Sequence, residues 1–253
     1  MKAAVYIFVF LSGLLSFAQS NVAFDQGNTL YNGGKYQEAI SIYESILNNG
    51  QHSAEMYYNL GNAYYKLNSI APSIYYFEKA LKLKPKDKDI QNNLAFARNM
   101  TVDAIEAVPE VGFNRIMKSI IYMFNFDDWA KLSVGFSLAF VLLFLMYYFS
   151  YSTARKRLLF LSSFISLGLM VIVLFFAFQN YSLEKNDNPA IIFSQESQIK
   201  TEPNLRSETA FLLHEGSKVQ ILEMYDNNWA KIKIADGKTG WIAFDDIKPL
   251  NDI

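Results

Sequence analysis

The chain of 253 residues is 51% hydrophobic and carries 23 basic and 24 acidic side chains, a net charge of −1. It contains no cysteine, which excludes disulfides, iron–sulfur clusters, thiolate zinc sites and cysteine nucleophiles, and its two histidines leave little for metal chemistry. The charge is divided unevenly, because residues 19–110 carry a net −2 and residues 184–253 a net −4, whereas the rest of the chain carries +5. Nucleic-acid binding needs a basic patch on a folded surface, and the two segments outside the apolar part of the chain are both acidic. The composition therefore argues against nucleic-acid binding.

Residues 1–18 predict a secretory signal peptide. Lys2 precedes an apolar stretch, and Ser16 and Ala18 place small residues at the positions that signal peptidase reads before a cut. An uncleaved membrane anchor is the alternative. Both interpretations export the segment that follows.

A 34-residue period runs through residues 21–106. The pairs that repeat are Gly27 and Gly61, Asn28 and Asn62, Tyr31 and Tyr65, Tyr43 and Phe77, and Leu47 and Leu81. This period resembles the tetratricopeptide repeat, an all-α fold in which small residues lie where helices cross and aromatic or leucine side chains fill the gaps. The resemblance predicts repeats at about 20–53 and 54–87 and a capping helix at 88–105, with the next helix of the chain a candidate to complete the pair.

The concave surface of tetratricopeptide arrays binds peptides, and the resemblance assigns nine residues to that surface. They are Asn28, Tyr31, Asn32, Tyr58, Asn59, Asn62, Tyr65, Lys66 and Asn93. Asparagine can both donate to and accept from a peptide backbone, and tyrosine adds apolar area with a polar tip. Ordinary helix surface is the alternative. Phe24, Asp89 and Asn93 replace the basic residues with which the chaperone-binding subclass holds a C-terminal carboxylate, which argues against that ligand.

Residues 113–131 mix apolar and charged side chains and reach Trp129, a residue type that gathers at membrane boundaries. We predict an interfacial helix over this range. A helix that closes the preceding repeat domain is the alternative.

Two uncharged stretches, residues 132–151 and 158–178, are long enough to span a bilayer as helices. The loop predicted between them, residues 152–157, carries three basic side chains, and positive charge in a short loop marks the cytoplasmic side. Both outer flanks are therefore predicted to be periplasmic. Neither span contains an ionisable side chain, which argues against a transporter or a channel.

Residues 190–250 predict a small all-β barrel. Three segments rich in β-branched and aromatic residues read as strands: Lys218–Tyr225, Trp229–Ile234 and Thr239–Phe244. Asp236-Gly237 provides a hairpin turn between the last two, because glycine tolerates a positive φ.

The spacing of Glu215-Gly216, Trp229 and Gly240-Trp241 resembles that of bacterial SH3 domains. Related domains bind cell-wall peptides or protein segments, so the resemblance implies a ligand face. Its residues are expected to be Tyr225, Trp229, Trp241 and Phe244. Packing of the two tryptophans in the core or at the rim of the barrel is the alternative.

The sequence therefore predicts a multidomain membrane protein with an all-α tetratricopeptide-repeat domain, a two-helix transmembrane hairpin and a small all-β SH3-like barrel. This order, with Asn92-Asn93-Leu94-Ala95 and Asp103-Ala104-Ile105-Glu106 after the repeats, resembles the BatE-type proteins of the Bacteroidetes aerotolerance operon. The resemblance implies von Willebrand A-domain membrane proteins as partners and, indirectly, a MoxR-type ATPase. It also implies a place in the bacterial inner membrane, with both soluble domains on the periplasmic side.

Two functions agree with these features. The first is a non-catalytic adaptor that recruits proteins through both periplasmic domains, within an aerotolerance or envelope-stress complex. The second is an envelope sensor or tether whose SH3-like domain binds peptidoglycan. We expect no enzyme, cofactor or metal, because the sequence contains no nucleophile motif, phosphate loop, metal-ligand spacing or helical carboxylate pair. His52 and His214 are expected to be ordinary surface residues.

Overall fold

The structure, a computed structural model, describes residues 22–106, 108–109 and 112–251. The predicted signal peptide lies outside the described residues. The chain divides into two compact units, one formed by Met1–Ala107 with Asn188–Ile253 and the other by Val108–Asp187. The helical repeats and the β-domain therefore belong to one unit. The second unit is an insertion between them in the chain.

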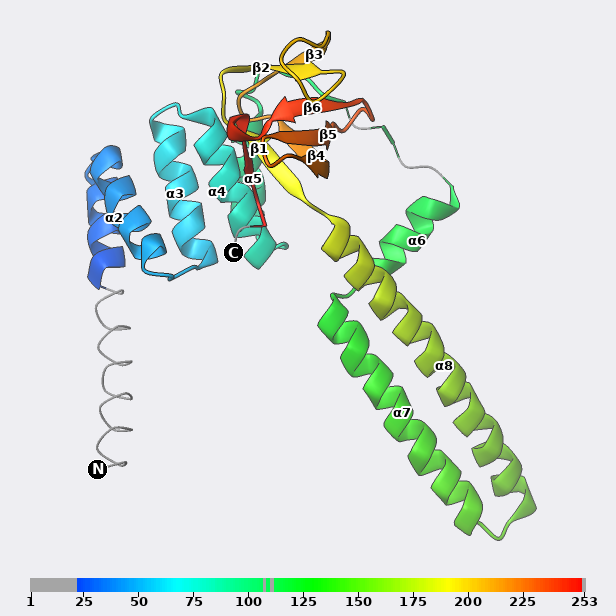
Figure 1. Ribbon diagram of the computed structural model, residues 1–253. Coiled ribbons are helices and arrows are strands. Elements are labelled where there is room, and N and C mark those ends of the chain that lie inside the picture. The colour runs from blue at the N-terminus through cyan, green and yellow to red at the C-terminus, as the bar shows by residue number, and fades with distance from the viewer. Residues whose placement is uncertain (1–21, 107, 110–111, 252–253) are drawn as a thin grey trace, which may run out of the picture. The chain divides into compact units, whose positions relative to one another are not determined.

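The first unit begins with an array of helices (Figure 1). Helical residues 22–32 are followed by α2 (Tyr36–Asn48), α3 (Ala54–Lys66), α4 (Ile70–Leu83) and α5 (Lys88–Arg98). Neighbouring helices pack against one another along the chain, α3 on α4 most extensively. This is the architecture that the tetratricopeptide period predicts.

The 34-residue period has a packing cause. A Cβ atom on Gly27 would overlap the ring of Tyr43, and a Cβ atom on Gly61 would overlap the ring of Phe77. Both rings are fully buried. In each repeat the glycine thus lets an aromatic ring lie directly on the neighbouring backbone, and Ser73 Oγ adds a hydrogen bond to the carbonyl oxygen of Gly61 at 2.9 Å.

The predicted helix over 88–105 is too long, because α5 ends at Arg98. Thr101 Oγ1 donates to the carbonyl oxygen of Arg98 at 2.8 Å, which satisfies one of the carbonyls left free at a helix end. Residues 101–106 continue without regular secondary structure. The helix over 113–121 belongs to the second unit, and its pairing with α5 stays a prediction.

The C-terminal part of the first unit is a seven-stranded antiparallel sheet in the order β3-β2-β6-β5-β4-β1-β7. The strands are β1 (Pro189–Ile192), β2 (Glu196–Lys200), β3 (Thr209–His214), β4 (Lys218–Tyr225), β5 (Trp229–Lys233), β6 (Thr239–Ala243) and β7 (Ile247–Pro249). Alternate side chains of β5, Ala230 and Ile232, are fully buried in the core. Gly237 takes the positive φ of 93° that the predicted hairpin turn requires. The SH3-like all-β fold is confirmed.

The barrel packs on the end of the helical array (Figure 1). Ile191 of β1 and Leu250 are fully buried in the same apolar cluster as Ile74 of α4. The rings of Tyr75 and Phe193 meet edge to face with their centroids 5.6 Å apart. Repeat arrays need a cap on their last apolar face, and here the barrel covers that face.

Charged side chains reinforce this contact. Glu78 of α4 is buried and accepts a hydrogen bond from Lys218 Nζ at 2.8 Å, and it also pairs with Arg98 of α5. Lys82 Nζ donates to the carbonyl oxygen of Leu250 at 3.3 Å and to Asn251 Oδ1 at 2.7 Å. A buried carboxylate is costly without partners, so the two cations allow Glu78 to lie at the contact.

The second unit contains α6 (Phe113–Ile121), α7 (Phe126–Phe149) and α8 (Thr153–Asn186). Helices α7 and α8 lie side by side as a hairpin (Figure 1). Both are long and apolar enough to cross a membrane, and most of their side chains are not buried within the protein. Such a surface is suited to a lipid environment.

The hairpin differs from its prediction at both ends. The expected interfacial helix over 113–131 is broken at residues 122–125, where Asn125 Oδ1 accepts from Asp128 N–H at 2.8 Å and caps α7. The expected loop over 152–157 is shorter, because α8 begins at Thr153 and its first turns carry the three basic residues. Alanine, arginine and lysine have high helix propensity, so Ala154 and the three basic residues favour a helical start over a loop.

Replacing Gly216 by alanine tests the packing of the barrel on the array. A Cβ atom there would lie 2.9 Å from Thr101 Cγ2 and 3.0 Å from both Ile70 Cγ2 and Ile74 Cδ1, at a φ of 85°. We expect the free energy of unfolding to fall by about 2–4 kcal/mol, from backbone strain and overpacking together. Urea unfolding of the detergent-solubilised chain, followed by tryptophan fluorescence, measures the loss.

Gly237→Ala is the matched control. Gly237 has a similar φ of 93°, but a Cβ atom there would have no neighbour within 4 Å. This variant is expected to lose only the strain, about 1–2 kcal/mol. Equal losses for the two variants would show that the barrel does not contact α4 in solution.

Candidate functional site

The nine residues predicted for the peptide surface all line one groove of about 600 Å³ on the helical array. They come from the first helix of each repeat: residues 22–32, α3 and α5. Phe77 and Phe96 also line it, and neither was predicted. Phe96 is largely exposed and lies three residues after Asn93 on α5. An apolar residue on the polar face of that helix could have identified it as a groove residue.

Four of the asparagines form two equivalent pairs. Asn59 Nδ2 donates to Asn28 Oδ1 at 2.8 Å, and Asn93 Nδ2 donates to Asn62 Oδ1 at 2.8 Å. The second pair is the first one displaced by one 34-residue repeat. The repeat therefore reproduces a hydrogen bond across the groove as well as the packing beneath it.

Tyrosines fix the orientation of these amides. The hydroxyl of Tyr43 donates to Asn28 Oδ1 at 2.7 Å, and Asn93 Nδ2 donates a second bond to the hydroxyl of Tyr58 at 2.9 Å. Burial raises the pKa of Tyr43 to about 12, so this hydroxyl keeps its proton and remains a donor at neutral pH. Asn28 Oδ1 is thereby fixed as the acceptor.

Each pair keeps one donor and one acceptor for a ligand. Among the described residues, no partner is found for the amide Nδ2 of Asn28 and Asn62 or for the carbonyl Oδ1 of Asn59 and Asn93. A peptide unit presents one N–H and one C=O, and an asparagine pair of this kind can accept from the first and donate to the second. The groove thus offers two such positions, one per repeat.

The predicted ligand face of the barrel is only partly brought together. Tyr225, Trp229 and Trp241 lie on adjacent strands β4, β5 and β6, and the two tryptophans alternate with buried residues of β5 and β6. The rings of Tyr225 and Trp241 meet at 6.1 Å, and Lys231 Nζ lies 5.7 Å from the Trp241 ring centroid. Phe244 instead packs against the buried core cluster.

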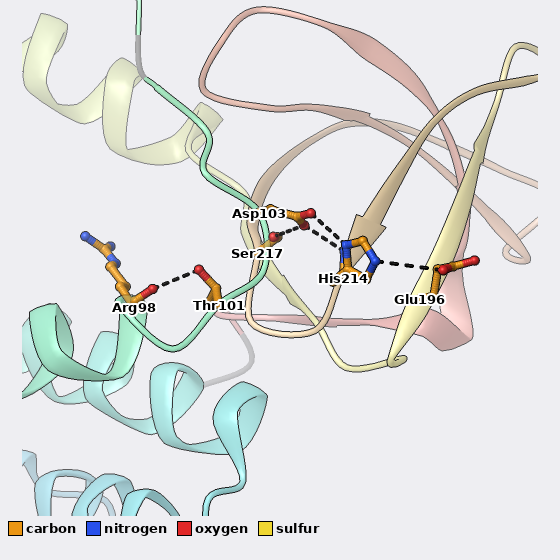
Figure 2. Close-up of polar contacts among 6 residues, drawn as sticks. All are labelled: Arg98, Thr101, Asp103, Glu196, His214 and Ser217. Carbon is orange, nitrogen blue, oxygen red and sulfur yellow. Dashed lines mark hydrogen bonds and ion pairs between the residues drawn. The ribbon is translucent and has the colours of Figure 1, made fainter.

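A third polar cluster joins residues 101–106 to the barrel, and sequence reasoning missed it (Figure 2). Asp103 accepts from the His214 backbone N–H at 2.7 Å, from His214 Nδ1 at 2.7 Å and from the Ser217 hydroxyl. Glu196 Oε2 lies 3.8 Å from the other ring nitrogen of His214. His214 is therefore not the ordinary surface residue that its position at a strand end predicted.

This cluster shifts two pKa values. Burial alone would raise the pKa of the Asp103 carboxyl, but the hydrogen bonds from His214 and Ser217 outweigh it and hold that pKa below its ordinary 3.8. The hydrogen bond to Asp103 raises the pKa of His214 above 6.5, with a smaller contribution from the charge of Glu196. Each group thus favours the charged form of the other.

Comparison with known families agrees with the two folds. Residues 24–88 are similar to a family described as tetratricopeptide repeat, and residues 198–248 to one described as bacterial SH3 domain. No curated protein matches the chain. Strand β1, Leu250 and residues 101–106, which join the barrel to the array, lie outside both matched segments.

The Asp103–His214 contact predicts a pH dependence of stability. A histidine whose folded pKa is raised contributes stability that is present below 6.5 and is lost as the pH rises through its folded pKa. Asp103, with a lowered pKa, contributes stability that is lost only in acid, as the pH falls below 3.8. We expect the thermal midpoint of His214→Gln to lie furthest below that of the wild type between about pH 4 and 6.5, and to approach it toward pH 8.5.

Ser217→Ala is the control, because it also removes a donor to Asp103 but titrates no group. Its loss, about 1 kcal/mol, is expected to stay constant from pH 5 to 8.5. A difference between wild type and His214→Gln that does not change over this range contradicts the charged contact.

Proposed function

We propose that this protein is a non-catalytic adaptor of the bacterial inner membrane that holds extended segments of partner proteins in the groove of its helical array. The observation that carries the proposal is the repeated asparagine pair, Asn28 with Asn59 and Asn62 with Asn93. Each pair leaves one donor and one acceptor at the groove, and the two pairs are related by the repeat. A ligand with a regular alternation of N–H and C=O groups, an extended peptide, satisfies both.

The side chains around the pairs favour binding of the peptide backbone with apolar contacts. Tyr31, Tyr65 and Phe96 line the same groove, which contains one basic residue, Lys66. Tyrosine and phenylalanine supply large contact areas at a low cost in side-chain entropy. The groove therefore suits an internal segment with apolar side chains better than a carboxylate at a chain end.

The connectivity supports a placement of both soluble parts on one side of the membrane. The segments before and after the hairpin share the buried cluster that contains Ile74, Ile191 and Leu250. Segments that share a core lie in the same compartment, so the chain between them crosses the membrane an even number of times, as two spans do. The basic residues at Arg155–Arg157 favour the cytoplasm for the hairpin turn and thus the periplasm for the first unit.

The partners of the adaptor follow from the resemblance to BatE-type aerotolerance proteins. On that basis we propose von Willebrand A-domain membrane proteins as direct partners and a MoxR-type ATPase as an indirect one, in an aerotolerance or envelope-stress complex. A shared membrane would favour their encounter, because it confines adaptor and partner to two dimensions.

The second candidate is a tether that binds peptidoglycan through the barrel. The specific observation is the group Tyr225, Trp229 and Trp241, of which Tyr225 is half exposed. Aromatic rings with a neighbouring Lys231 suit both the sugar faces and the peptide stems of a cell-wall polymer. This face is formed by Tyr225, Trp229 and Trp241, whereas the helical array meets β1, the chain end and Lys218 at the start of β4.

The groove assignment is tested by the triple variant Tyr58→Ala, Asn62→Ala, Tyr65→Ala. We expect A-domain membrane proteins to co-purify with the detergent-solubilised wild type and to be lost from the variant, at least about tenfold, because a peptide clamp and two aromatic contacts are removed. Circular dichroism checks that the variant is folded, and Asn62→Ala alone provides a milder version.

The control is Asn48→Ala with Asn49→Ala, which alters exposed asparagines at the end of α2, away from the groove. It is expected to retain the partners. Unchanged co-purification by the folded triple variant would reject the groove as the binding site.

The tether has its own test, sedimentation of the solubilised full chain with purified peptidoglycan. If the tether exists, the wild type is retained and Trp241→Ala is not, because the variant removes the ring between Tyr225 and Lys231. No retention of the wild type above a buffer control rejects the tether and leaves the adaptor.

A further inference from the structure

Residues 101–106 lie on the barrel in the manner of a bound peptide. Partly buried and exposed side chains alternate along all six residues. Thr101, Asp103 and Ile105 are partly buried, whereas Val102, Ala104 and Glu106 are exposed. A period of two is that of an extended chain with one face on a surface.

Three side chains anchor this connector, each by different chemistry. Thr101 Cγ2 packs where Gly216 leaves room for it. Asp103 accepts three hydrogen bonds from His214 and Ser217 (Figure 2). Ile105 packs against the buried apolar cluster of the barrel. A methyl group, a carboxylate and an aliphatic side chain are thus recognised at alternate positions.

The backbone contributes little to this attachment. Within the described part of the chain, residues 102–106 make no backbone–backbone hydrogen bond, although β-strands flank them. A strand built into the sheet would add a ladder of such bonds. The connector is therefore held by its side chains alone.

The groove beneath the connector is wider than the connector itself. A hollow of about 720 Å³ lies on one side, between residues 103–106 and the residues Lys218–Gln220 and Lys233–Ala235. A second hollow of about 430 Å³ lies on the other side, toward Phe211–Leu213 and Asp236. The same four connector residues line both, so they divide one larger groove.

We propose that the connector is an intramolecular ligand of the SH3-like barrel, and that the same groove binds in its place an extended partner segment carrying a carboxylate two residues before an aliphatic side chain. The carboxylate site is built from the barrel alone: the His214 N–H, the His214 ring and the Ser217 hydroxyl. The aliphatic side chain enters the apolar surface that Ile105 covers. This site is separate from the asparagine groove and from the aromatic face on β4–β6.

Covalent attachment gives the connector an advantage over any partner. Tethered segments act at effective concentrations on the order of millimolar, so a free peptide competes poorly with the wild-type connector. Weakening the connector's own anchors removes that competition without touching His214 or Ser217. The expected effect is therefore a gain of binding, which a merely unfolded variant does not produce.

The test measures fluorescence anisotropy of a labelled peptide with the sequence of residues 98–107, added to the detergent-solubilised full chain. Asp103→Ala with Ile105→Ala is expected to bind it at least about tenfold more tightly than the wild type. A peptide with asparagine in place of Asp103 is expected to bind that variant about tenfold or more weakly, since a charge-assisted contact is lost. Asp103→Asn alone, which preserves size, serves as a second opened variant with a smaller gain.

Val102→Ala with Glu106→Ala is the matched control, because both side chains are exposed, and it is expected to bind as weakly as the wild type. The proposal is overturned if a folded opened variant binds neither peptide, if it binds both alike, or if the control gains as much as the opened variant. The triple substitution in the asparagine groove is expected to leave this peptide's binding unchanged. Loss of partner co-purification and loss of peptide binding therefore report on two different sites.

Discussion

The structure depends on one contact, the burial of Ile191 and Leu250 against Ile74 and its neighbours on α4. These apolar residues come from segments of the chain that the hairpin separates, and neither the array nor the barrel covers its own share of them alone. Burial of apolar surface away from water is stabilising. The segment before the hairpin and the segment after it therefore fold together. The ion pair between Glu78 and Lys218 and the hydrogen bonds of Lys82 follow from that packing, since they lie at its edge.

A single body changes what the two modules can do. The asparagine groove and the aromatic face of the barrel keep a fixed spacing when the contact holds, so two ligands would be presented together. The hairpin is then an insertion in this body, with both of its ends attached to the same fold. Two binding sites on one such body are held at a fixed geometry, which two modules on flexible linkers are not.

Local patterns predicted the parts of the fold that local packing determines. The glycine and aromatic positions of the 34-residue period identified the helices, because one repeat specifies where they cross. The resemblance to tetratricopeptide repeats then assigned the nine residues that line the groove. Strand β4 has its predicted bounds, Lys218–Tyr225, because the β-branched and aromatic residues of this segment favour a strand. Whether those nine residues bind a peptide stays a prediction.

The missed features all depend on residues far apart in the chain. The chain leaves the helical path after Arg98, and Asp103 in the following segment is held by His214 and Ser217, 111 and 114 residues away, which no helical period records. His214 was predicted to be an ordinary surface residue because its partner, Asp103, lies in a distant segment of the chain. The barrel as the cap of the array was missed because β1 and Leu250 each contribute only a few apolar residues, too few to distinguish from an ordinary strand.

The central claim is that the array and the barrel form one rigid body, and pulsed electron paramagnetic resonance tests it most directly. The chain contains no cysteine, so Lys86→Cys and Lys238→Cys place two spin labels at unique exposed sites, one on the array and one on the β5–β6 turn. In lipid nanodiscs the account predicts a single narrow distance distribution. A broad distribution, as two domains on independent tethers would give, would contradict it.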